Sequence, residues 1–279
     1  MLETMGSEPA RLTRALGAGL AVAVLVTGAL AQDRPLAFGV LNQQSPTRTA
    51  ERWNPILHYV TTQTGVPLQL RMGPTVQETN ALMAKGELDF VFTNHVFQTE
   101  FDSLGYRVIA RWAGEPIRGV IAVPADSPVK SLKDLDGRRV AFPSVDAFVG
   151  YAVPVLALRQ AGVKVEEVFA GNQEGVLAQL KARRVDGGAV NSRFLAQYAE
   201  REGLHFREVF VSQGYPDLAV IAHSRLSAPV VDKVRQALIG MKSDAAAAPI
   251  LARAASRGFE PATDRDYDSV RHVYRLIGQ

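Results

Sequence analysis

Polar side chains that could hold a small anion follow several apolar runs of this sequence. A short buried strand, a turn at Pro143-Ser144 and a helix that continues to Gln160 are predicted by VAFPSVDAFVG, residues 140–150. The first N–H groups of a helix have no partner inside the helix, and the helix dipole favours negative charge there. This junction could therefore bind an anion. It could equally be an ordinary strand–helix junction in which Ser144 and Asp146 only cap the helix.

Further polar side chains stand where other predicted strands end. Thr93, Asn94 and His95 could donate three hydrogen bonds into one site. Arg193 could hold a carboxylate or an oxyanion through two N–H groups, and it could equally be a surface arginine. The first polar loop adds Gln43, Gln44, Thr47 and Arg48, although such a loop could equally be only solvated. Gln173 and Asn191 complete the candidates. Neutral amides such as these suit a polar ligand that is not highly charged.

No metal site or cofactor is expected. The five histidines lack the spacing of metal ligands, and no carboxylate cluster accompanies His95. The absence of cysteine excludes disulfides, thiol catalysis and a lipid anchor on an N-terminal cysteine. Trp53 and Trp112 are expected in the core rather than as stacking platforms.

The elements that must position these side chains alternate along the first third of the chain. Apolar runs predict strands at 36–41, 68–72 and 88–92. Helical spacing of apolar residues predicts a helix over Trp53–Val60. A capping box at Thr75–Glu78 opens another helix, which Gly86 ends. This βαβαβ order implies a parallel sheet, in which ligands bind beyond the carboxyl ends of the strands.

The second half repeats this architecture without repeating its residues. Ser131 can cap a short helix that Gly137 ends, and Asn191–Arg193 reads as a polar loop after a strand. The other predicted strands are 108–112, 119–123, 140–142, 165–169, 185–190, 206–211 and 218–222. The other predicted helices are 175–182, 229–241, 245–256 and a last one that begins at Thr263–Asp266.

Composition and the N-terminus indicate an exported globular protein. Of 279 residues, 47% are hydrophobic and 21% charged, and the net charge of +3 includes no Lys/Arg block that would suggest nucleic-acid binding. Arg11 and Arg14 precede an apolar run that ends in Ala29-Leu30-Ala31, which predicts a signal peptide cleaved after Ala31 and a periplasmic location. An uncleaved anchor is the alternative, but the run of about 16 residues is shorter than the ~20 that a membrane span needs.

Four segments occur in a specific order between residues 36 and 276: FGVLNQQSP with RWNPILHYVTTQTGVPLQL, GELDFVFTNH, DSPVKSLKDLDGRRVAFPS with VGYAVPVLAL, and AGNQEGVLAQLKARRVDGGAV. In this order they resemble the phosphonate/phosphite-binding (PhnD-like) family of periplasmic binding proteins of ABC transporters. The resemblance implies an α/β protein with the type II periplasmic binding-protein fold, in which two crossing strands join two α/β lobes and the ligand binds in the cleft. Beside the signal peptide (1–31), it implies lobe one (32–122), which the chain leaves near 122–124, lobe two (123–217) and a return to lobe one (218–279).

The resemblance also implies a ligand grip that this sequence has altered. In phosphonate binders a Ser-Thr-Ser triplet before a Gly-aromatic pair holds the phosphonate oxygens. Here Ala147, Phe148 and Val149 precede Gly150-Tyr151, so the hydroxyl groups are absent.

Other family positions are changed as well. The family's tyrosine after a lobe-one strand corresponds to Thr93, its histidine corresponds to Gln173, and its acidic residue in lobe two falls near Arg193. The acidic residue before the return strand is kept as Asp217. The sequence therefore indicates the family more firmly than it indicates a phosphonate ligand.

The implied function is that of a periplasmic solute-binding protein. It would capture a small polar or anionic ligand, such as a phosphonate- or phosphite-like oxyanion, for the permease of an ABC importer. We expect a monomer that binds no nucleic acid. A periplasmic sensor for a membrane histidine kinase is the alternative. An enzyme is least favoured, because the sequence has no nucleophile–base pair and no paired acids at useful spacing.

Overall fold

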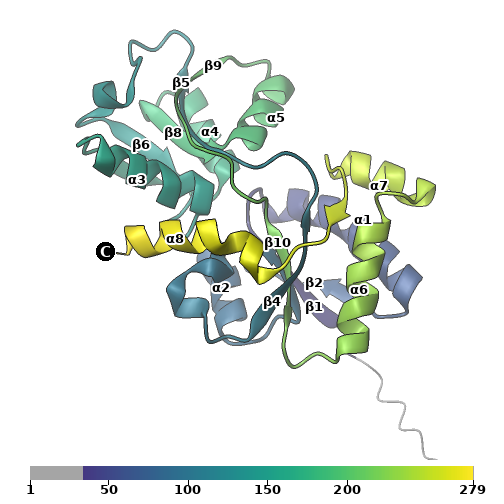
Figure 1. Cartoon of the computed structure of the whole chain (residues 1–279). Coiled ribbons are helices and arrows are strands. Elements are labelled where there is room, and N and C mark those ends of the chain that lie inside the picture. Colours follow the sequence, from purple (N-terminus) through teal and green to yellow (C-terminus); the bar gives the residue numbers. More distant parts are fainter. Residues whose placement is uncertain (1–33, 279) are drawn as a thin grey trace, which may run out of the picture. The chain divides into compact units, whose positions relative to one another are not determined.

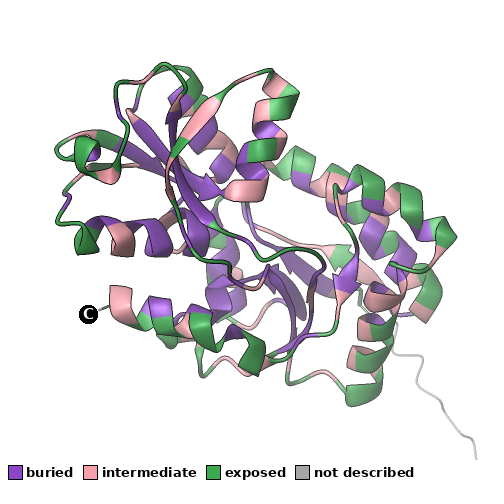
Figure 2. Cartoon of the chain, turned by 45° about the horizontal axis from the view of Figure 1, so that its top comes forward, coloured by how far each residue is buried: buried purple, intermediate pink, exposed green. Residues whose placement is uncertain are grey.

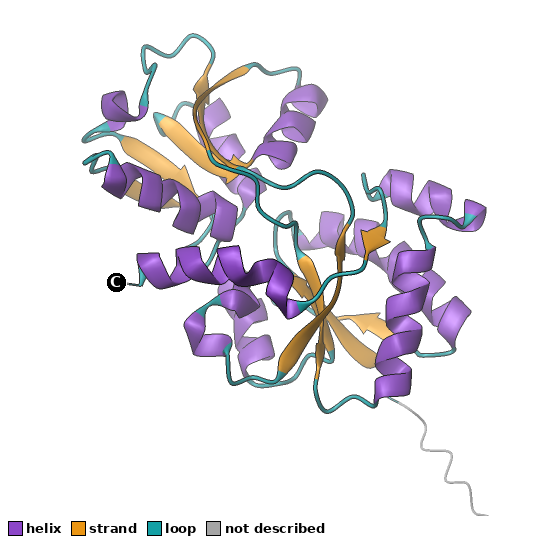
Figure 3. Cartoon of the chain, viewed as in Figure 1, coloured by secondary structure: helices purple, strands orange, loops and turns teal. Residues whose placement is uncertain are grey.

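Residues 34–278 are described by a computed structural model, and they form two α/β lobes (Figures 1 and 3). The first lobe contains β1 (Leu36–Val40), α1 (Pro46–Thr64), β2 (Leu68–Leu70), α2 (Val76–Ala84), β3 (Phe90–Thr93), β4 (Tyr106–Trp112), β10 (Ala219–His223), α6 (Ala228–Gly240), α7 (Ala248–Arg253), β11 (Phe259–Glu260) and α8 (Asp268–Ile277). Its strands form one mixed sheet in the order β11-β4-β10-β3-β1-β2. The parallel pairs β1–β2 and β1–β3 are those that the βαβαβ pattern predicted.

The second lobe is one continuous stretch of chain. It contains β5 (Gly119–Pro124), β6 (Arg139–Phe142), α3 (Val153–Gln160), β7 (Glu166–Phe169), α4 (Gln173–Lys181), β8 (Gly187–Asn191), α5 (Ser192–Glu202) and β9 (Phe206–Val211). Its sheet has the order β7-β6-β8-β5-β9. The first lobe, in contrast, is assembled from both ends of the described chain.

Local sequence signals account for the first two helices. In α2 the Thr75 hydroxyl accepts a hydrogen bond from the Glu78 N–H at 3.2 Å, and the Glu78 carboxylate accepts one from the Thr75 N–H at 3.0 Å. The predicted capping box is therefore confirmed. In α1, Trp53 and Val60 are buried on one face, and Gly65 ends the helix in the left-handed conformation with φ 69°.

Some predicted elements differ from the structure. The predicted polar loop at Asn191–Arg193 is wrong, because Asn191 caps α5, an amphipathic helix that buries Phe194 and Tyr198. The helix after Pro143-Ser144 begins later than expected, with a π-helical turn at Phe148–Ala152. Strand β11 was not predicted, because its two residues are too few for an alternating pattern.

Two chain segments, residues 113–118 and 212–218, connect the lobes. Ile117 and Tyr215 pair there through two backbone hydrogen bonds of 2.8 Å. Strand β5 pairs with β8 and β9 in the second sheet, so the chain leaves the first lobe before Gly119 and not at 122–124 as predicted. The return before β10 lies close to the predicted position.

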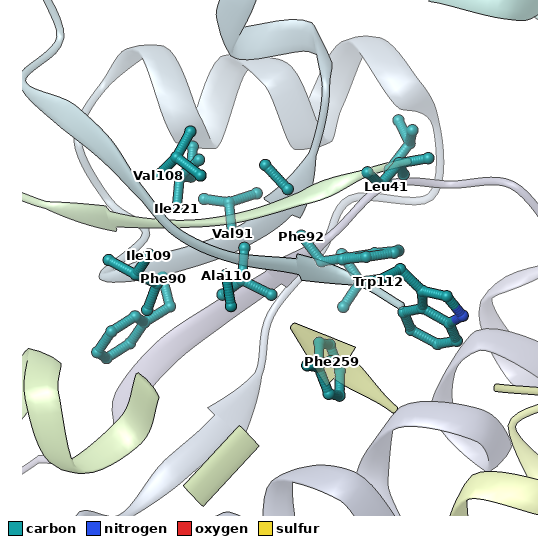
Figure 4. Close-up of a cluster of buried hydrophobic side chains, with 14 of the residues drawn as sticks. Leu41, Phe90, Val91, Phe92, Val108, Ile109, Ala110, Trp112, Ile221 and Phe259 are labelled. Atoms are coloured by element: carbon teal, nitrogen blue, oxygen red, sulfur yellow. The ribbon is translucent and has the colours of Figure 1, made fainter. Parts of the chain in front are cut away.

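The largest hydrophobic core lies in the first lobe and reaches the boundary between the lobes (Figures 2 and 4). Trp112 packs against Phe92, Trp53 and Phe259, with ring centroids 4.9, 5.5 and 5.3 Å apart. Both tryptophans are buried, which confirms the prediction that they belong to the core. This aromatic cluster packs around Trp112, the last residue of β4.

The described helices include none with the length and apolar composition that crossing a bilayer requires. The predicted signal peptide and its cleavage after Ala31 lie outside the described residues.

Candidate functional site

Three adjoining hollows lie between the lobes. The outer chamber, of about 310 Å³, is lined by Gln44, Arg48, Glu51, Arg52, Gln197, Arg201, Arg253, Ala254 and Ala255. The side chamber, of about 250 Å³, is lined by Trp112, Ala113, Gly114, Glu115, Arg193, Gln197, Ala255 and Arg257. The inner pocket, of about 30 Å³, is lined by Gln43, Arg52, Phe92, Trp112, Asn191, Arg193, Phe194, Gln197 and Asp217. Because Gln197 borders all three, they form one site bounded by α1, α5 and the end of α7.

Arg52, on α1, borders both the outer chamber and the inner pocket. Its Nε is buried and has no hydrogen-bond partner among residues 34–278. Its guanidinium carbon lies 5.1 Å from the centroid of a Trp112 ring. Burial lowers the pKa of Arg52 to about 10, and nearby Asp217 opposes that change, so the side chain stays charged at neutral pH. A buried charged donor without an acceptor costs free energy that an anionic ligand could recover.

Arg193 and Asp217, two predicted site residues, form an ion pair at the inner pocket. Arg193 also donates from Nη2 to the Glu115 carbonyl at 2.8 Å. Asp217 is buried, which raises its pKa, whereas the Arg193 charge opposes this rise. Two nitrogen atoms of Arg193 are thus engaged by protein oxygens, and the pair offsets its own charge. Of these neighbouring arginines, Arg52 is therefore the better placed to receive an anion.

Two neutral amides organise the start of α5 beside this pair. The Asn191 side chain accepts from the Arg193 N–H at 2.9 Å, and Gln173 accepts from the Asn191 N–H at 2.8 Å. Both side chains are buried, but only Asn191 lines the inner pocket. Gln173 therefore positions the strand end.

Glu174 ties the lobes together at the edge of the outer chamber. From α4 of the second lobe its carboxylate accepts from the Ser45 N–H at 3.4 Å and lies 3.4 Å from Arg48 Nε, both in the first lobe. It also pairs with Arg201 of α5 at 3.2 Å. Arg48 and Arg201 therefore share one carboxylate across the boundary. Thr47 and Arg48 lie in the first turn of α1 and not in the predicted polar loop, and Thr47 is exposed and lines none of the three hollows.

A second polar network joins the lobes next to Thr93–His95. His95 is 1% exposed, and its Nδ1 lies 3.2 Å from the Asn80 side-chain oxygen. Asn80 in turn donates to the Asp146 carboxylate of the second lobe at 3.0 Å. Burial lowers the pKa of His95 to about 3 and raises the pKa of Asp146. Thr93 accepts from the His95 N–H at 3.0 Å. Thr93–His95 therefore lies near the turn before α3, but protein groups satisfy much of the hydrogen bonding there.

The turn before α3 does not carry the capping that we expected. The helix cap is Ala147, no side chain caps it, and the predicted capping roles of Ser144 and Asp146 are therefore wrong. Phe148 is buried between Tyr215 and Tyr274, with ring centroids 4.9 and 5.2 Å apart. The Ser144 hydroxyl is buried and has no partner among the described residues. An aromatic contact between the lobes thus occupies the position where the family pattern has hydroxyl groups.

The structure divides the predicted residues into two groups. Gln43, Gln44, Arg48, Asn191, Arg193 and Asp217 line the three hollows, and Thr47, Thr93, Asn94, His95, Ser144, Ala147, Phe148 and Gln173 do not. Sequence reasoning missed Arg52, Gln197, Arg201 and Arg253. The spacing of Arg48 and Arg52 by four places both on one helix face after the first strand, and this signal could have identified Arg52. Within residues 34–278 no group of three or more His, Asp or Glu side chains could hold a metal ion.

Comparisons with known proteins agree with the fold and with the family that the sequence resembles. Residues 38–267 match the family described as ABC transporter, phosphonate, periplasmic substrate-binding protein. The structure of PhnD1 from Prochlorococcus marinus in complex with methylphosphonate is 18% identical in sequence. The match covers 87% of this chain and 98% of PhnD1, with a TM-score of 0.78. The structure of XAC2383 from Xanthomonas citri bound to ATP is 19% identical in sequence. That match covers 87% of this chain and 98% of XAC2383, with a TM-score of 0.69. The predicted type II periplasmic binding-protein fold is confirmed by these likenesses.

A curated relative matches a smaller part of the chain. ATP phosphoribosyltransferase from Thermodesulfovibrio yellowstonii is 35% identical over 98 residues. These residues are 33% of this chain and 31% of the relative, so the chain spans about a third of that protein's length.

Proposed function

We propose that this chain, which belongs to the family of periplasmic substrate-binding proteins of phosphonate ABC transporters, captures a small anion in the hollows around Arg52 for import. Membership of this family was predicted from the sequence and is confirmed. Members of the family bind a small-molecule ligand and deliver it to a transporter permease. The family description names no residues, so the assignment of binding to Arg52 and its neighbours rests on the structure of this chain.

The observation that carries the proposal is the unsatisfied, buried Nε of Arg52. Natural proteins rarely leave a buried charged donor without an acceptor, because desolvation is then not offset. An anion beside Arg52, where the outer chamber meets the inner pocket, would accept from this Nε and could also reach the side-chain amides of Gln43 and Asn191, which line the inner pocket. Hydrogen bonds to charged groups contribute about 1.5–3 kcal/mol each.

The ligands of similar proteins support an anion. The matched structures hold methylphosphonate in PhnD1 and ATP in XAC2383, and both ligands are negatively charged. In this chain Ala147, Phe148 and Val149 stand where the resemblance led us to expect hydroxyl groups. We therefore assign the main anion contact to Arg52, with Gln43, Asn191 and the Arg193–Asp217 pair around it.

We infer binding without chemical conversion, by a monomeric protein in the periplasm. The family description is of binding proteins, and its members act in that compartment. Bending at residues 113–118 and 212–218 would let the lobes open and close, a recurrent motion in two-lobed binding proteins. The Glu174 and Asp146 contacts across the boundary would form as the lobes close.

Replacement of Arg52 tests this assignment. In titration calorimetry with methylphosphonate and with inorganic phosphate, Arg52→Gln should weaken binding by about 10- to 150-fold, which corresponds to the loss of one charged hydrogen bond. The melting temperature of the ligand-free variant should be equal or higher, because a buried charge without an acceptor is removed.

The matched control is Arg235→Gln. Arg235 lies on α6, pairs with Asp232 at 3.5 Å and lines none of the three hollows, so the variant loses the same charge outside the site. Its affinity should equal that of the wild type. Unaltered anion affinity of Arg52→Gln, or a wild-type protein that binds no anion at all, would refute the proposal.

A further inference from the structure

The outer chamber has more room than a single anionic group fills. The inner pocket, of about 30 Å³, matches the ~30 Å³ that one water molecule occupies in the liquid. The outer chamber, of about 310 Å³, reaches the range of roughly 300–1,000 Å³ that is typical of ligand pockets. Arg52 borders both, so an anionic group bound to Arg52 would have an organic remainder in the outer chamber and not deeper in the protein. Methylphosphonate, with one methyl group as its remainder, would leave most of that space unused.

The charge of the outer chamber is also greater than one anionic group requires. Four arginines and one glutamate line it. Arg48 and Arg201 share the carboxylate of Glu174. Arg253, in the last turn of α7, is exposed and takes part in none of the ion pairs within residues 34–278. The chamber therefore presents two guanidinium groups without a carboxylate partner, one on its inner wall at Arg52 and one at Arg253.

We infer that the outer chamber recognises an organic phosphate that carries a second anionic group. This inference rests on the proposed function, because it extends the same anion site. A phosphate group has three terminal oxygens in a tetrahedral arrangement, so it can offer a separate oxygen to Arg52 and to each of the amides of Gln43 and Asn191, whereas the two oxygens of a carboxylate lie in one plane. The second anionic group lies toward Arg253. Arg48 and Arg201 add attraction that weakens with salt.

The test compares three anionic probes that differ in the number and the chemistry of their anionic groups. Titration calorimetry is run with methylphosphonate, with fructose 1,6-bisphosphate as the molecule with two phosphate groups, and with succinate as the molecule with two carboxylates. The wild-type protein should bind the bisphosphate at least tenfold more tightly than methylphosphonate and more tightly than succinate. In Arg253→Gln the preference for the bisphosphate over methylphosphonate should fall about tenfold, because one of its two contacts is lost.

The control and the outcomes separate this inference from the proposed function. Arg235→Gln, which removes an equal charge outside the chamber, should keep the wild-type preference. Equal affinity for methylphosphonate and the bisphosphate, or an unchanged preference in Arg253→Gln, overturns the inference while anion binding at Arg52 stands. Succinate binding as tight as that of the bisphosphate overturns the assignment to phosphate. Failure of all three probes to bind overturns both the inference and the proposed function. Because Arg253 is exposed, its variant should keep the wild-type melting temperature, which is measured first.

Discussion

His95 is held as a neutral imidazole in the contact between the lobes, and acidification should therefore reduce stability through this one side chain. Burial lowers its pKa from 6.5 to about 3 in the folded protein. In the unfolded chain His95 takes up a proton near its ordinary pKa, so between these two values the unfolded state binds more protons than the folded state. By linkage, stability is then complete above about pH 6.5 and is lost as the pH falls toward 3.

The expected size follows from the two pKa values. Between pH 7.5 and 5.0, protonation of the unfolded state should lower the free energy of unfolding by about 2 kcal/mol, and the loss would approach ~5 kcal/mol near pH 3. Asp146, linked to His95 through Asn80, acts in the opposite direction, because its pKa is raised by burial and its ionisation opposes folding as the pH rises. A comparison with a variant that lacks only His95 cancels the contribution of Asp146, because both proteins contain it.

The assay is urea unfolding of the wild type and of His95→Gln at pH 7.5 and 5.0. Glutamine can still bond to Asn80 but does not titrate, so the stability advantage of the wild type over the variant should shrink by about 2 kcal/mol at the lower pH. His58→Gln, at an exposed position of α1, is the control and should keep the wild-type pH dependence. Parallel stability profiles for the wild type and His95→Gln would refute the account of a buried neutral histidine.

Three further substitutions test the scaffold of the site. Gly119→Ala should destabilise by about 1–3 kcal/mol, measured as a shift of the urea midpoint, because the new Cβ would lie 2.5 Å from the Val149 carbonyl oxygen; an unchanged midpoint would contradict this. Ala255→Gly should raise the melting temperature, with a gain of about 0.5–1 kcal/mol in the free energy of unfolding. Ala255 has φ 48°, a conformation that glycine adopts without a steric penalty. A lower melting temperature would show that the strain is absent. Thr75→Ala should cost about 1 kcal/mol in thermal unfolding, because the hydroxyl that accepts from the Glu78 N–H is lost, whereas equal stability would mean that water replaces this cap.

Elements with strong local signals were predictable from the sequence. The predicted capping box at Thr75–Glu78 forms, and Ser131, predicted only as a capping residue, forms a box with Asp134. A short polar side chain followed three residues later by a carboxylate can satisfy free N–H groups with no help from the rest of the fold. The parallel order of the first three strands follows from alternation of apolar runs and helices, which also depends on nearby residues.

The proposed anion site was harder to predict because it depends on contacts between distant residues. Arg52 reads as an ordinary arginine on an amphipathic helix, and only the approach of Trp112 and of α5 buries its Nε. Likewise Asp217 and Arg193 were both named, but their pairing with each other could not be read from a separation of 24 residues. The crossing position was missed because a strand in either sheet has the same apolar pattern as Gly119–Val123.

The discontinuous first lobe has a consequence for the order of folding. Strand β10 lies between β3 and β4 in the first sheet, so these two earlier strands have no shared neighbour until residues 219–223 have been synthesised. The second lobe is complete once β9 has emerged, at residue 211. Contacts of long sequence separation form slowly, because the entropy of closing a long loop must be overcome first. The second lobe should therefore gain protection from hydrogen exchange before the first sheet does. The first-lobe side of the proposed site, which carries Arg52 on α1, should be completed last.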